Sequence, residues 1–208
     1  MIAASIKENQ MDTVLQKLQE VPGNYDLIEI WINEIQNVDV GKLLEKANKP
    51  LLIKITDTSN QELIDEVLAH DPAYLDIDLD SFDPDLISKK KNTKLILSFH
   101  NFTGTHLYSG ALEIAKKMKA LGADIGKIIM TAEKVEDNLI PLRLLAESET
   151  MGLPLVSFCM SEKGRLSRII SASFGNMINF VPPNAEWKTA EGQIELSEWE
   201  DLRKKLKF

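Results

Sequence analysis

The chain has 208 residues, of which 44% are hydrophobic, and this is enough to bury a full core in one domain. Its 32 acidic and 24 basic residues give a net charge of −8, and no run of like charge exceeds three residues, which argues against a nucleic-acid partner. A single cysteine, Cys159, excludes an internal disulfide, and with only three histidines it also argues against a metal site. We therefore predict neither a metal nor a cofactor.

The apolar runs fall short of the roughly 18 residues that a membrane helix needs. The N-terminal apolar run, residues 1–6, is also too short for the core of a signal peptide. We therefore expect a cytoplasmic protein without membrane contact. A small-molecule substrate is then the expected partner, and a homodimer is left open as its assembly.

Short apolar runs alternate with longer segments of helical spacing along the whole chain. The runs typical of strands occupy 2–6, 27–32, 51–55, 74–79, 95–99, 125–130, 153–158 and 177–181. Helical spacing appears between them at 14–18, 40–44, 63–68, 112–118, 139–145 and 166–170, with a minimal helix at 83–90 and a closing helix at 199–206. This alternation predicts βα units around a parallel sheet.

Eight strands, each followed by a helix, predict a (β/α)₈ TIM barrel that forms a single domain over residues 1–208, a short chain for this fold. The competing arrangement is an open doubly wound sheet. That alternative is disfavoured because the first predicted βα turn, residues 6–10, contains none of the glycines of a dinucleotide site.

The active site of a parallel barrel forms at the C-terminal ends of its strands. Polar or bulky residues stand there in three predicted strands, where a purely structural strand would have Val or Ile: Glu29 and Trp31, Lys54 and Thr56, and Asp76 and Asp78. The two aspartates have a structural alternative, since they could cap helices or pair with lysines. Glu29 lies in an otherwise apolar strand and needs a hydrogen-bond partner, which His100 or Lys127 would supply.

His100 and Lys127 lie 27 positions apart on two apolar strands, which leaves room for one helix between them. A parallel sheet could therefore bring them side by side, as an acid/base and an amine nucleophile. A lysine inside a strand stays an ammonium only if it is paired, and otherwise its pKa falls toward the neutral amine. The alternative is a strand-end lysine that reaches solvent. We count Glu29 with this pair as a candidate catalytic residue.

An ordered set of segments resembles the type I 3-dehydroquinate dehydratases, lyases of the shikimate pathway with a (β/α)₈ fold. Residues 97–102, followed by Thr105, resemble the catalytic-histidine segment of that family, and residues 122–128 resemble its Schiff-base lysine strand. Residues 153–160 with Gly164, 167–169 and 174–175 are similar to its seventh and eighth units, and residues 191–194 are similar to its C-terminal Pro-Gly-Gln loop.

The resemblance implies a mechanism. Lys127 would form an imine with the C3 ketone of 3-dehydroquinate, and His100 would move the protons that yield 3-dehydroshikimate and water. Arg168 would hold the substrate carboxylate, with Gln193 and Thr189 hydrogen-bonding from a closing loop. Without the resemblance, Arg168 would be interpreted as part of an ion pair on a helix surface.

The chain departs from the family pattern where the substrate hydroxyls are recognised. Trp31 and Thr56 stand at two family arginine positions, residues 57–62 lack the Glu-Gly-Gly signature, and Asn101 replaces the aspartate beside the histidine. Lys54 shares a strand face with Thr56, so its ammonium could compensate from inside the barrel, near Glu29, His100 or the ligand. We expect Lys54, Thr56 and Trp31 to bind substrate.

Two other functions stay open on the sequence alone. One is a Schiff-base lyase or aldolase that acts on a different small keto acid, with Trp31 as an apolar wall. The other is a non-catalytic barrel that binds a small acid or a protein partner.

Overall fold

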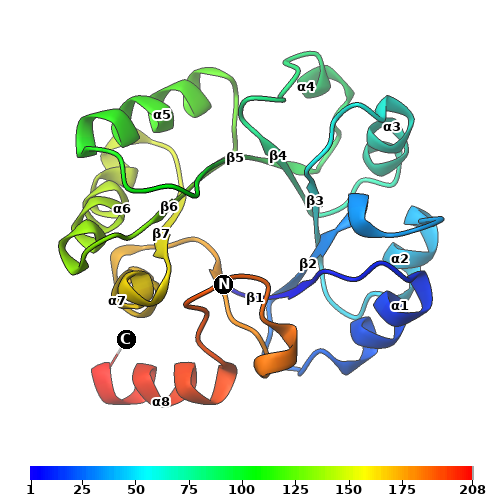
Figure 1. Cartoon of the computed structure of the whole chain (residues 1–208). Helices are drawn as coiled ribbons and strands as arrows, with labels where there is room; N and C mark the ends of the chain where they lie inside the picture. Colours follow the sequence, from blue (N-terminus) through cyan, green and yellow to red (C-terminus); the bar gives the residue numbers. More distant parts are fainter. Residues whose placement is uncertain (208) are drawn as a thin grey trace.

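The computed structural model describes residues 1–207 as a ring of strands surrounded by helices (Figure 1). Over these residues the eight strands are β1 (Ile2–Ile6), β2 (Leu27–Trp31), β3 (Leu51–Ile55), β4 (Tyr74–Asp78), β5 (Lys94–Asn101), β6 (Ile125–Thr131), β7 (Leu155–Met160) and β8 (Asn179–Phe180). The α-helices of this range are α1 (Met11–Glu20), α2 (Val40–Lys46), α3 (Gln61–Ala69), α4 (Leu86–Lys89), α5 (Tyr108–Ala120), α6 (Leu139–Met151), α7 (Arg165–Ile170) and α8 (Leu196–Leu206). Short 3₁₀ helices occupy Ile32–Glu34, Val135–Asn138, Glu162–Gly164, Ser171–Phe174 and Ala185–Trp187.

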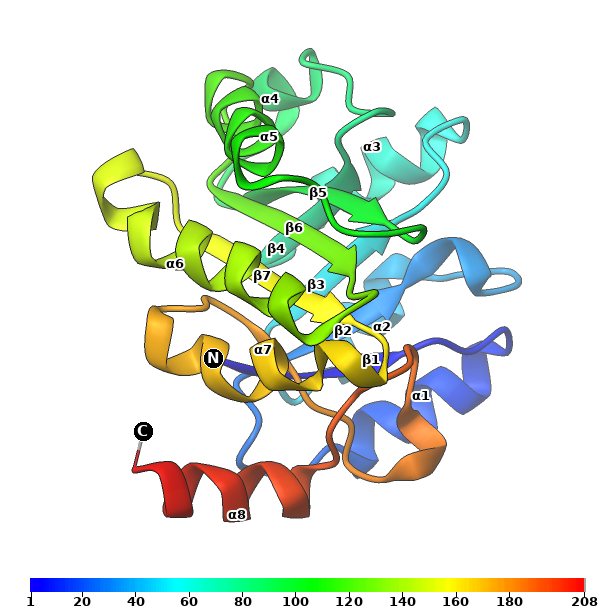
Figure 2. The same cartoon turned by 60° about the vertical axis from the view of Figure 1, so that its left-hand side comes forward.

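The predicted barrel is confirmed. All strand pairs are parallel, in the order β7-β6-β5-β4-β3-β2-β1-β8, and Figure 2 shows the strand arrows running toward the same end. Three predicted strands were wrong by two residues at one end or both, and the ends of the other strands agree to within one residue. Strand β5 continues to Asn101, β7 starts at Leu155 because Pro154 has no N–H for the ladder, and β8 keeps only two of its five predicted residues.

The barrel is nearly closed, with its seam between β7 and β8, where residues 1–207 form no strand ladder. The side chain of Asn176 bridges this seam. Its Oδ1 accepts from the backbone N–H of Ser157 at 2.8 Å, and its Nδ2 donates to the carbonyl of Ile178 at 2.8 Å. A backbone bond of 2.9 Å from Met177 to Leu155 joins the same two segments. The side-chain amide of Asn176 therefore supplies hydrogen bonds in place of a β7–β8 ladder and holds β8 beside β7.

The apolar residues form two clusters. The larger one lies between the strands and the surrounding helices, and the smaller one fills the barrel interior with Leu27, Leu52, Ile96 and Ile125 among its members. Because side chains alternate along a strand, the next inward positions toward the C-terminal end are Glu29, Lys54, Ser98 and Lys127. The barrel thus has an apolar floor beneath a polar layer.

Among residues 1–207, no helix has both the length and the apolar character that crossing a bilayer requires.

Candidate active site

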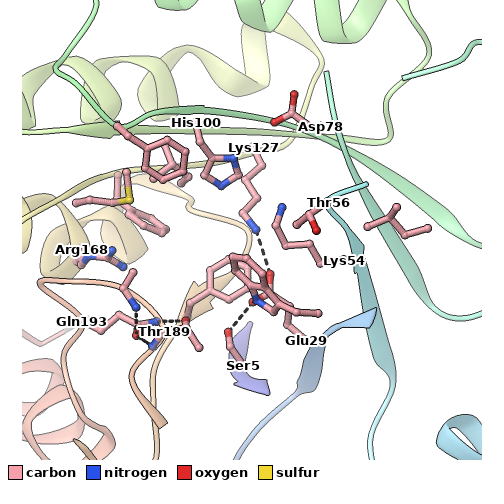
Figure 3. A pocket seen from close by; sticks show the side chains of 18 of the residues that line it. Ser5, Glu29, Lys54, Thr56, Asp78, His100, Lys127, Arg168, Thr189 and Gln193 are labelled. Carbon is pink, nitrogen blue, oxygen red and sulfur yellow. Dashed lines mark hydrogen bonds and ion pairs between the residues drawn. The ribbon is translucent and has the colours of Figure 1, made fainter. Parts of the chain in front are cut away.

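A cavity of about 340 Å³ opens at the C-terminal end of the strands, above the apolar floor. All nine residues that the sequence analysis selected for the site line this cavity. Ten of the cavity-lining residues are labelled in Figure 3, and they come from β1 to β6, from α7 and from the segment before α8.

Lys127 lies at the bottom of the cavity and is 5% exposed, so it is not the solvent-exposed lysine that the sequence left open. Its Nζ donates to Asp76 Oδ2 at 2.8 Å and to Glu29 Oε1 at 3.1 Å, and it lies 4.4 Å from the centre of the Phe180 ring. Burial alone would lower the pKa of Lys127, but the two carboxylates outweigh burial and raise it. In the resting site Lys127 is therefore an ammonium.

Asp76 is fully buried and accepts hydrogen bonds from two lysines through the same oxygen. Burial would raise the pKa of Asp76, but Lys127 and Lys54 hold it well below its usual range. Asp76 is one of the polar strand residues that the sequence shows, but it was not among the predicted site residues. Its pairing with a lysine was one of the alternatives left open, and the strand register that places it beside Lys54 on β3 was not visible in the sequence.

The Glu29 carboxylate has three donors, of which Lys127 was one of the two predicted partners. Ser5 Oγ donates to Oε2 at 2.6 Å, and Trp31 Nε1 donates to the same oxygen at 3.1 Å. Trp31 therefore does more than form an apolar wall, since it orients Glu29. Ser5 was missed because a serine near the end of a strand carries no signal until the β1–β2 register sets it opposite Glu29.

His100 lies next to Lys127 because β5 and β6 are neighbours (Figure 3). Ser98 is the residue in register with Lys127, so His100 lies two positions nearer the cavity mouth. Burial, with repulsion from Lys54 and Lys127, lowers the pKa of His100 to about 3. At neutral pH the ring is thus uncharged and has a free lone pair that can accept a proton.

Lys54 points into the barrel, as its strand parity predicted, and is 4% exposed. Its ammonium partner is Asp76 at 3.4 Å, not the expected Glu29 or His100. The Nζ also lies 5.5 Å from the centre of the Trp31 ring. Thr56, two residues further on, is exposed at the cavity mouth, where its N–H donates to Asn33 Oδ1 at 2.8 Å.

Arg168 projects from α7 into the cavity and is 7% exposed, so the surface ion pair considered for it is wrong. Its guanidinium lies 4.3 Å from the centre of the Phe158 ring, and Nη2 donates to the Glu191 carbonyl at 3.4 Å. Within residues 1–207 its Nε has no hydrogen-bond partner and no carboxylate pairs with it. Burial lowers the pKa of Arg168 only to about 10, so a buried and uncompensated cation faces the cavity.

Gln193 shapes the loop that covers this side of the cavity. Its Oε1 accepts from the backbone N–H groups of Thr189 at 2.7 Å and Ala190 at 3.1 Å. The neighbouring Gly192 has φ +77°, and a Cβ there would collide with the Ser161 carbonyl. The loop is thereby held against the end of β7, with Thr189 and Gln193 both at the cavity wall.

No three His, Cys, Asp or Glu side chains in the described part of the chain gather closely enough to hold a metal ion. The available chemistry is that of two amines, an imidazole, three carboxylates and a guanidinium.

A family model described as type I 3-dehydroquinase matches residues 2–207. The chain belongs to this family. The predicted resemblance is therefore confirmed. A curated 3-dehydroquinate dehydratase of Hydrogenobaculum sp. is 30% identical over 97% of this chain and 96% of its own length. The 3-dehydroquinate dehydratase of Desulfotalea psychrophila is 29% identical over 95% of this chain and 94% of its own length.

Solved structures share the fold. The 3-dehydroquinate dehydratase of Geobacillus kaustophilus is 22% identical, with a TM-score of 0.88 over 99% of this chain and 90% of that one. A type I enzyme from Clostridium difficile, also 22% identical, has a TM-score of 0.86 over 99% and 91% of the two chains, and its structure contains covalently modified comenic acid.

Replacing Asp76 by Asn should lower the free energy of unfolding at pH 7 by about 3–5 kcal/mol, because two buried ammonium groups lose their shared anion. The folded-state pKa of Asp76 is depressed, so its stabilising effect is present above about pH 4 and lost as the pH falls further. Urea unfolding from pH 3 to pH 8 should show the two proteins converging in acid. Asp78→Asn, on the same strand but without a lysine partner, is the control and should change stability by less than about 0.5 kcal/mol.

Proposed function

We propose that the chain is a carbon-oxygen lyase that converts 3-dehydroquinate to 3-dehydroshikimate and water through an imine on Lys127. Membership of the type I 3-dehydroquinase family supports this reaction. The observation that carries the mechanism is the placement of a buried lysine beside an uncharged histidine, in a cavity that also contains an uncompensated arginine. These three side chains come from β6, β5 and α7.

Lys127 supplies the covalent step. As a neutral amine it attacks the C3 ketone, and loss of water gives an imine whose protonated form draws electrons from the C2–H bond. Glu29 and Asp76, which hold the ammonium at 3.1 and 2.8 Å, also stabilise the positive charge of this iminium. The same carboxylates therefore serve the resting site and the intermediate.

His100 moves the protons. Its uncharged ring removes the C2 proton, and the imidazolium then protonates the C1 hydroxyl, which leaves as water. The pKa near 3 keeps the ring available as a base throughout the neutral range. Loss of the C2 proton turns the cationic iminium into a neutral enamine, so a neighbouring positive charge disappears as the imidazolium forms.

Arg168 binds the substrate carboxylate. A buried guanidinium without a carboxylate partner is costly unless a ligand provides the anion. Gln193 and Thr189 lie beside it on the loop against β7, so the loop that Gln193 organises closes over the carboxylate end of the substrate.

Trp31 favours a second candidate substrate, a small keto acid with an apolar face. Its indole N–H is already used by Glu29, so the ring offers the ligand a surface and no hydrogen-bond donor. Kinetics with 3-dehydroquinate and with smaller keto acids lacking ring hydroxyls distinguish the two. The proposed function requires the larger kcat/KM for 3-dehydroquinate.

Lys127→Ala should abolish turnover and prevent a borohydride-reduced adduct with 3-dehydroquinate, which mass spectrometry detects on Lys127 of the unmodified chain. The variant should also be less stable. Its free energy of unfolding should fall by about 3–5 kcal/mol because Asp76 and Glu29 lose a cation. Activity within about tenfold of the unmodified chain would show that the imine mechanism is wrong.

His100→Ala should slow turnover by about 10² to 10⁴-fold while the Lys127 adduct still forms and accumulates. Intact-protein mass spectra after borohydride quenching measure the adduct. His106→Ala is the control, because His106 packs on Phe99 and does not line the cavity. Absence of the adduct in His100→Ala would assign this histidine to imine formation instead.

Arg168→Lys should raise KM for 3-dehydroquinate by about five- to 150-fold, equivalent to about 1–3 kcal/mol, because an ammonium cannot form the planar two-bond contact with a carboxylate. Arg165→Lys provides a matched control on the same helix, since Arg165 pairs with Glu198 at 2.6 Å outside the cavity. Equal KM values for the two variants would contradict the carboxylate site.

A further inference from the structure

Two buried lysines share one carboxylate oxygen at the bottom of the cavity. Lys127 donates to Asp76 Oδ2 at 2.8 Å and Lys54 donates to the same oxygen at 3.4 Å. The register explains the arrangement, because Lys54 and Asp76 are direct neighbours across β3 and β4. The proposed mechanism uses Lys127 as the nucleophile and leaves Lys54 without a role.

The two ammonium groups are not held equally. Among residues 1–207, Lys127 has two carboxylates within 3.1 Å, whereas Lys54 has Asp76 alone, at the longer distance, and the face of Trp31. The ionisable groups that face this pair across the cavity are Glu29, Asp76, Asp78, His100 and Arg168. Burial, with repulsion from Lys127, lowers the pKa of Lys54 despite Asp76, while the pKa of Lys127 is raised. As the pH rises, Lys54 therefore gives up its proton before Lys127 does.

Lys127 needs a proton acceptor before it can react, because an ammonium has no electron pair with which to attack a ketone. His100 is a weak acceptor at this stage, since its pKa is about 3. A neutral Lys54 amine is the stronger base, and a hydrogen-bonded path through Asp76 Oδ2 already joins it to Lys127.

We propose that Lys54 accepts the proton that Lys127 loses as the imine forms, with Asp76 Oδ2 as the relay; this inference rests on the proposed function. An N–H bond of Lys127 breaks as its proton passes to Asp76 Oδ2, and an N–H bond forms on Lys54 as the oxygen passes a proton on. Asp76 ends as a carboxylate and the net charge of the site is unchanged. The electron pair freed on Lys127 then attacks the C3 ketone, and Lys54 acts as a positioning residue that need not touch the substrate.

The test is the pH dependence of adduct formation in Lys54→Met. Borohydride trapping with 3-dehydroquinate is followed by mass spectrometry from pH 5 to pH 10. In the variant Lys127 must lose its proton to solvent, so the pH of half-maximal trapping should move up by about one unit or more. The trapping rate at pH 7 should fall about tenfold for each unit by which the midpoint moves up. It should recover at alkaline pH, where Lys127 loses its proton to solvent.

Lys7→Met is the matched control. Lys7 lies 4.4 Å from the centre of the Trp31 ring and 3.6 Å from Glu34, and it has no contact with Asp76. It should reproduce the pH profile of the unmodified chain. A Lys54→Met protein with an unchanged midpoint and a raised KM at every pH would overturn the proposal and make Lys54 a substrate-binding residue.

A measurement on the unmodified chain covers the case in which Lys54→Met does not fold. Carbon-13 NMR of protein labelled at lysine Cε follows each amine during a pH titration. The proposal requires Lys54 to titrate at a lower pH than Lys127, and the reverse order overturns it. Failure of the proposed function has a different signature, since the unmodified chain would then form no adduct with 3-dehydroquinate at any pH while the order of titration stays measurable.

Discussion

The Asp76 carboxylate, placed between Lys127 and Lys54, is the interaction on which the rest of the site depends. Charged groups are costly in a barrel interior, and here an apolar floor lies directly beneath them. When both lysines are protonated, the cluster with Glu29 contains two anions and two cations, so its charges balance. This balance allows an amine to be buried where a ketone can reach it, and it fixes which atoms the proton can move between.

Arg168 is the exception to this balance. Its guanidinium packs against Phe158 and finds only a backbone carbonyl for Nη2, whereas the charges of the lysine cluster are all paired. A ligand carboxylate would give the Arg168 guanidinium the anion that it lacks. The cavity therefore has two ends with different electrostatics, a neutral cluster for covalent chemistry and a cationic end for binding, and a substrate carrying both a ketone and a carboxylate can span them.

Two departures from the family pattern, Trp31 and Thr56, both concern where positive charge lies in the cavity. Trp31 stands where the family has an arginine, and its N–H supports Glu29. Thr56 stands at a second such position and bonds Asn33 at the cavity mouth. The cation nearest to these positions is instead Lys54, deep in the barrel and paired with Asp76. The family pattern thus implies positive charge at the mouth, whereas the Lys54 ammonium of this chain lies deep in the cavity beside Asp76.

The sequence by itself determined the barrel. Short apolar runs alternate with segments of helical spacing along the chain, and few topologies bury every strand of such a pattern. The sequence also allowed Lys127 and His100 to be expected side by side, since one helix separates their strands. It could not determine that Asp76 joins the lysines, that Asn176 bridges the seam or that Arg168 is buried. Those facts depend on register and on the packing of α7, which are set by contacts between residues far apart in the chain. The periodicity of one strand shows which side chains point inward, and only the closed barrel decides which of them meet.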